Sequence, residues 1–267
     1  MISEMLAFAP LFLLLAVRAL ALIETSPLLS SEANPQVSRV ALAGFAAYAA
    51  FPSAGAVSAA GIELFSISFV FLLIGEAIIG IIMGFFVTIV FSTFAAAGQF
   101  FSLQMGFSMA EAVDPLSQIE NPLMGQYLNL VAMLVFLTLN GFTHLFQSGF
   151  WRSVQSLNIL SLVQGRETAL GMLLSGLSRL FLDAMVISLP ILGTLFLTSL
   201  STGLISKAAP QINILAEGFP VSITVAFILI LATMPFMVET FGNVVDTGFS
   251  AVQDLYIRIG RIIGGGA

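Results

Sequence analysis

Three charged residues lie inside long apolar runs of this sequence, where few side chains could do chemistry. Glu76 stands in the middle of one run, and Arg179 and Asp183 stand in another. Arg179 and Asp183 are four residues apart, a spacing that places opposite charges on one face of a helix. Charges at membrane depth are costly unless they are paired or face a polar cavity. The three residues therefore indicate either an ion or proton path or, the interpretation we favour, buried charges at contacts between helices or between subunits.

Other chemistry has little support in the residue types. The chain has no cysteine and a single histidine, His144, so neither a thiolate site nor a pair of histidine ligands can form. The metalloprotease, serine hydrolase and P-loop motifs are missing from the sequence. The sequence therefore predicts no enzyme, no metal site and no cofactor.

Composition indicates the surroundings of the chain. Of 267 residues, 58% are hydrophobic and 8% are charged, whereas soluble domains carry about a quarter of charged residues. Too little polar surface is available to coat a globule, so membrane lipid is the expected environment. The net charge of −6 is scattered, and nucleic acid is not an expected partner because its binding needs clustered Lys and Arg.

Apolar runs predict the elements that must position these charges. Roughly 20 apolar residues cross a bilayer, and runs near or above that length occupy 5 to 23, 64 to 100, 126 to 147, 169 to 205 and 219 to 240. A weaker, Ala-rich run occupies 40 to 60. We expect an all-α membrane protein of about six hydrophobic helices in a single domain covering residues 1–267.

Two of these runs exceed one plain span. The runs 64 to 100 and 169 to 205 would each extend about 55 Å as helix, so each tilts, breaks or projects beyond the bilayer. Pro190 and the GxxxG pair Gly80 and Gly84 mark places where a bend is cheap or where helices approach closely. Arg18 within the first run, without a basic segment before it, favours a retained first helix over a cleaved leader.

The segment between the third and fourth helices does not read as an ordinary connection. It runs from Gly98 to Gln126 and is too apolar for a solvated loop and too broken for a span. Asp114–Pro115 is a turn dipeptide, and Gly106 permits tight backbone. A compact loop packed against other protein is the expected form. Residue types alone leave open whether it is an interfacial loop or a movable plug.

Three ordered motifs carry a resemblance to a known family. The segment LQMGFSMAEAVDP resembles the Gln, Gly, Phe and Asp-Pro signature of the FliR (SctT) proteins. The stretch Ser26 to Ala43 resembles their early segment with two prolines and an arginine, and Ala209 to Ile223 resembles their motif near the last helix. In that last motif the matching residues are Pro210, Asn213, Gly218, Phe219 and Pro220.

The resemblance implies a role in protein secretion. FliR proteins form an export gate with FliP and FliQ chains, next to FlhB, in the bacterial inner membrane at the flagellar basal body. Unfolded subunits leave the cytoplasm through this gate. The resemblance also implies that the loop helps to close the channel. The residues to which it assigns this plug or gate role are Gln104, Met105, Gly106, Phe107, Met109, Asp114 and Pro115.

Two other classes of protein compete with this interpretation. A secondary transporter of small solutes would use Glu76, Arg179 and Asp183 near helix breaks, although no clear inverted repeat is present in the sequence. A passive membrane scaffold would need neither a moving loop nor a pore. Within the resembled family a virulence injectisome is the alternative to a flagellum, which we favour as the commoner setting.

Overall fold

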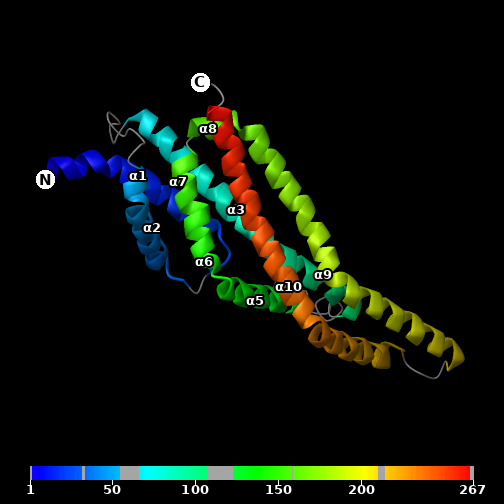
Figure 1. Ribbon diagram of the computed structural model, residues 1–267. Helices are drawn as coiled ribbons and strands as arrows, with labels where there is room; N and C mark the ends of the chain where they lie inside the picture. The colour runs from blue at the N-terminus through cyan, green and yellow to red at the C-terminus, as the bar shows by residue number, and fades with distance from the viewer. Residues whose placement is uncertain are drawn as a thin grey trace. The chain divides into compact units, whose positions relative to one another are not determined.

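The computed structural model describes residues 2–31, 34–54, 66–106, 123–157, 159–209 and 214–264, and these residues contain helices and no strand. Figure 1 shows these helices coloured along the sequence from blue to red. The chain divides into two compact units. The first comprises Met1–Ile89, Asn140–Leu177 and Asp246–Ala267, and the second comprises Val90–Leu139 and Ser178–Val245. Because the units interleave along the sequence, the expected single domain stays a prediction.

The first unit begins with two packed helices. Helix α1 (Ile2–Thr25) packs against α2 (Gln36–Ala50), whose buried face consists of alanines. Pro35 precedes the first residue of α2, and a 3₁₀ turn, η1 (Phe51–Ala54), follows it around Pro52. In the described part of the Ala-rich run, α2 has 15 residues, fewer than the roughly 20 that cross a bilayer.

The two overlong runs are single helices. Helix α3 (Ile67–Met105) has 39 residues, and α9 (Arg166–Ala208) has 43 with Pro190 inside it. Helix α10 (Ile214–Gly264) has 51 residues, far more than the apolar stretch 219 to 240 predicts. Its second half alternates buried Val252, Leu255 and Ile259 with exposed polar residues. A search for apolar runs therefore finds the uniformly apolar first half of α10 and misses its amphipathic second half.

The predicted run 126 to 147 is interrupted. Helix α5 (Leu123–Thr138) ends before Asn140, whose φ of 54° is left-handed. Asparagine tolerates this conformation better than most residues, so the chain turns there by 74° despite its apolar neighbours. The next run consists of α6 (Gly141–His144), a π-helical turn η2 (Leu145–Trp151) and α7 (Arg152–Ser156), followed by α8 (Ile159–Gln164).

Three described helices are long and apolar enough to cross a membrane. They are Ile67–Met105, Arg166–Ala208 and Pro220–Ile259, and the bent pair around Asn140 makes a fourth if it counts as one span. Many large apolar side chains on these helices are exposed, among them Phe71, Leu174 and Leu231. The protein is therefore an all-α membrane protein, as its composition predicts.

Candidate functional site

The central polar feature of the first unit is a buried ion pair between α1 and α3. Arg18, 2% exposed, donates from Nε to a carboxylate oxygen of Glu76. Its Nη1 donates to the Ser153 hydroxyl at 3.2 Å, and its Nη2 donates to the Leu157 carbonyl at 3.0 Å. Each nitrogen of the guanidinium thus has an acceptor. A buried charge with this many partners is held in place and joins α1, α3 and the end of α7.

Glycines bring the two helices of this ion pair together. A β-carbon at Gly80 would lie 2.3 Å from the carbonyl oxygen of Arg18, and one at Gly84 would lie 2.8 Å from that of Leu22. The GxxxG pair therefore permits the close approach of α1 to α3. The Thr88 hydroxyl adds a hydrogen bond to the Thr25 carbonyl at 2.7 Å.

Glu76 therefore has a partner that the sequence interpretation did not assign to it. Arg18 is the one charge within the apolar run 5 to 23, and Glu76 is the one charge within the run 64 to 100. Two lone opposite charges in two membrane helices are a signal for pairing, because each is costly alone. Their pairing takes place within the chain, between helices.

Arg179 and Asp183 differ in exposure. In the second unit Arg179 Nε lies 3.5 Å from an Asp183 carboxylate oxygen, at the expected i, i+4 spacing. The side chain of Arg179 is 60% exposed and that of Asp183 is 19% exposed. Within this chain Arg179 is thus largely uncovered, and its burial against another subunit stays a prediction.

The start of the predicted plug is described, and the rest is not. Gln104 is exposed and Met105 is fully buried at the end of α3, and Gly106 follows with a left-handed φ of 88°. The remaining predicted residues lie outside the described part of the chain: Phe107, Met109, Asp114 and Pro115.

Both helices that flank this segment pack against each other in the second unit. A β-carbon at Gly98 of α3 would lie 2.5 Å from the Met124 carbonyl oxygen of α5. Phe91 and Phe136 form an edge-to-face pair with ring centroids 5.4 Å apart. The described residues on either side of 107–122 therefore belong to two helices that contact each other, α3 and α5.

The motif near the last helix is only partly described. Gly218, Phe219 and Pro220 lie in the first turns of α10, which begins at Ile214. Pro220 is inside the helix, where it has no amide hydrogen to donate to the carbonyl four residues before it. Pro210 and Asn213 lie outside the described residues.

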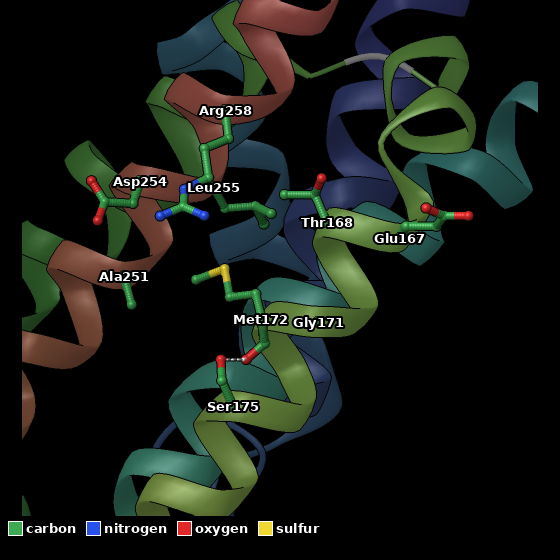
Figure 2. Close-up of a pocket in the computed structure, with 9 residues that line it drawn as sticks. All are labelled: Glu167, Thr168, Gly171, Met172, Ser175, Ala251, Asp254, Leu255 and Arg258. Atoms are coloured by element: carbon green, nitrogen blue, oxygen red, sulfur yellow. Dashed lines mark hydrogen bonds between the residues drawn. The ribbon is translucent and has the colours of Figure 1, made fainter.

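A pocket of about 520 Å³ lies in the first unit between the start of α9 and the end of α10. Figure 2 shows the Arg258 guanidinium directed into the gap beside Leu255 and Met172, with the carboxylates of Glu167 and Asp254 at opposite sides. The charged and hydroxyl side chains of the lining offer ionic and hydrogen-bonding contacts, and the lining has no histidine. Among the described residues, no three His, Asp or Glu side chains could hold a metal ion.

Known proteins match the chain along most of its length. A family model described as "Bacterial export proteins, family 1" matches residues 9–248. The flagellar biosynthetic protein FliR of Escherichia coli K12 is 31% identical over 253 residues, 95% of each chain. FliR of Bacillus subtilis is 28% identical over 253 residues, 94% of this chain and 96% of its own. The surface presentation of antigens protein SpaR of Shigella flexneri is 28% identical over 160 residues, 60% of this chain and 59% of its own.

A helical membrane protein matched in this way is a bacterial membrane export protein. The chain belongs to bacterial export proteins family 1, the family of FliR and its secretion-system relatives (SctT). The resemblance carried by the three sequence motifs is thereby confirmed.

Proposed function

We propose that this chain is the FliR-like subunit of a flagellar type III export gate in the bacterial inner membrane, at the flagellar basal body. With FliP-like and FliQ-like chains, and next to an FlhB-like protein, it forms the channel through which unfolded flagellar subunits are secreted. It acts as a channel component and not as an enzyme. The observation that carries the proposal is the similarity to FliR proteins over about the whole length of both chains.

A flagellar setting is favoured over an injectisome because the flagellar relatives match a larger share of this chain. The two FliR relatives match at least 94% of this chain, whereas SpaR matches 60% of it. The structure weakens the case for a secondary transporter. Glu76 is paired with Arg18, whose guanidinium also donates hydrogen bonds to Ser153 and Leu157. A carboxylate held in this way is poorly placed to bind and release a solute.

The proposed assembly is tested by purifying the tagged protein from its native membrane in mild detergent, with mass spectrometry of the bound chains. We expect FliP-like and FliQ-like chains in excess over the tagged protein, and their identity names the organelle. A protein recovered alone, or only with further copies of itself, would contradict the proposal and favour the transporter.

We further propose that the segment beginning at Gln104 closes the channel. An apolar constriction excludes water and ions, and flexible thioethers such as those of Met105 and Met109 yield to a passing chain. The packing of α3 against α5 at Gly98 supports this role, because it gives the segment a firm base on both sides.

Deletion of residues 106–113 should leave the complex assembled but make the membrane leaky to small ions. The reason is that the apolar barrier is lost while the helices that pack the subunit are kept. The measurement is ion-sensitive growth or dye uptake in cells, with a deletion of residues 55–62 as a control of equal length. Unchanged ion permeability at a normal level of complex would count against the plug.

Asp183→Ala should weaken assembly. Arg179, 60% exposed, would lose the carboxylate that accompanies it next to the exposed apolar side chains of Phe181 and Leu182. We expect a severalfold fall in co-purified partner chains at an unchanged level of the protein. Asp246→Ala removes an exposed carboxylate from α10 and is the matched control. A variant that assembles fully yet exports nothing would show that the pair serves translocation.

A further inference from the structure

The turn η2 is an irregular element in the middle of the first unit. Its residues, Leu145–Trp151, are π-helical, with one residue more per turn than the α-helices on both sides. At its end the Arg152 amide is shared between the carbonyls of Gln147 and Gly149. A shared amide gives each carbonyl only part of a hydrogen bond. The Gly149 carbonyl is buried with its residue and needs a further donor.

That donor comes from the far end of the sequence. The Tyr256 hydroxyl of α10 donates to the Gly149 carbonyl oxygen at 2.9 Å, across 107 positions of sequence. Tyr256 is 4% exposed, so its hydroxyl has no access to bulk water and depends on this acceptor as much as the carbonyl depends on it. The bond fixes the widened turn to α10.

The widened turn η2 sets the orientation of the helix that follows it, α7. Each residue of an α-helix advances the chain by about 100° and 1.5 Å. The extra residue in η2 therefore determines which side chains of the following helix face α1. In the observed phase the Ser153 hydroxyl, which donates to the Phe150 carbonyl at 2.6 Å, and the Leu157 carbonyl both face Arg18.

We propose that Tyr256 is a positioning residue that acts through the π-helical turn on the buried Arg18–Glu76 pair. Its hydroxyl keeps the turn widened, the widened turn presents Ser153 and Leu157 to Arg18, and these acceptors orient the guanidinium toward Glu76. The end of α10 and the α1–α3 ion pair are thus two ends of one polar connection. Its relevance to gating rests on the proposed function, whereas the connection itself does not.

Tyr256→Phe tests the first step, because it removes the hydroxyl and keeps the ring. Hydrogen exchange of the full chain in lipid nanodiscs, followed by mass spectrometry, reports on the peptide that covers 145–157. Loss of a buried hydrogen bond should raise exchange there by roughly tenfold. Tyr48→Phe is the matched control, since Tyr48 is 72% exposed, and should change nothing. Equal exchange in Tyr256→Phe and in the unsubstituted chain would overturn the proposal.

Two further variants separate positioning from local packing. Deletion of Gln147, an exposed residue of the turn, removes the extra residue and should make the hydroxyl dispensable. Tyr256→Phe should then raise exchange no further. Ser153→Ala, combined with Tyr256→Phe, should show strong non-additivity in thermal unfolding, although no hydrogen bond joins the two residues.

The experiments still test the proposal if one of the variants does not fold. If the Gln147 deletion does not fold, the Ser153 double-mutant cycle decides alone, and additive effects would show that Tyr256 acts only locally. The same conclusion follows if Tyr256→Phe raises exchange equally with and without Gln147. None of these measurements requires export, so failure of the proposed function would not be mistaken for failure of this connection.

Discussion

Arg18→Gln should prevent the protein from accumulating in folded form. The change leaves the Glu76 carboxylate, whose side chain is only 13% exposed, between α1 and α3 without its cation. Breaking a buried ion pair by removing one partner costs about 3–5 kcal/mol, a large part of the 5–15 kcal/mol by which proteins are typically stable. The measurements are the amount of protein in membranes and the midpoint of thermal unfolding in detergent.

Two variants identify the cause of that loss. Arg152→Gln removes an exposed guanidinium that has one bond of 3.3 Å to the Gln253 amide oxygen, and should change stability by at most about 0.5 kcal/mol. The double variant Arg18→Met with Glu76→Leu removes both charges and should recover most of the lost stability. If it is as unstable as Arg18→Gln, the uncompensated carboxylate is not the reason for the loss.

Gly80→Ala should have the second largest effect. Its β-carbon would lie 2.3 Å from the Arg18 carbonyl oxygen and 2.8 Å from the Ala21 β-carbon. Backbone cannot yield as a flexible side chain does, so α1 must move away from α3, at a cost of about 1–3 kcal/mol. The displacement also stretches the ion pair that the two helices share. Thermal unfolding of the purified chain measures the effect.

Gly193→Ala is the matched control for this substitution. Nothing lies within 4 Å of the position that a β-carbon at Gly193 would take, so the same chemical change meets no obstacle. Alanine is favoured over glycine inside a helix by roughly 0.5–1 kcal/mol. The unfolding midpoint of the isolated chain should therefore stay constant or rise. Similar losses in both variants would show that helix crossing at Gly80 is not the cause.

The sequence predicts the long helices well because their signal is local. The run 64 to 100 corresponds to α3 and the run 169 to 205 to α9, within a few residues at each end. The break at Asn140 was not predicted, since a single left-handed residue within an apolar run leaves hydropathy unchanged. The length of α10 was underestimated for the opposite reason, because its second half is amphipathic and not uniformly apolar.

The site is less accessible to sequence reasoning because its partners are distant. Arg18 and Glu76 are 58 positions apart, and Arg18 and Leu157 are 139 apart. Spacing finds pairs within one helix, such as Arg179 and Asp183, but not pairs between helices. The GxxxG motif predicts a close helix contact at Gly80 and Gly84, but it does not predict that the contacting helix is α1. The plug role of the residues from Gln104 to Pro115 remains a prediction.

The interleaved order of the two units has a consequence for biosynthesis. The first unit includes Asp246–Ala267 as well as Met1–Ile89, so it cannot be completed until the ribosome has translated both segments. Gly149 is translated 107 residues before Tyr256, which at about 5–20 residues per second is a delay on the order of 5–20 s. During that delay the Gly149 carbonyl has only its share of the Arg152 amide and lacks the Tyr256 hydroxyl, so chains that terminate early in α10 should be recognised and degraded as incomplete.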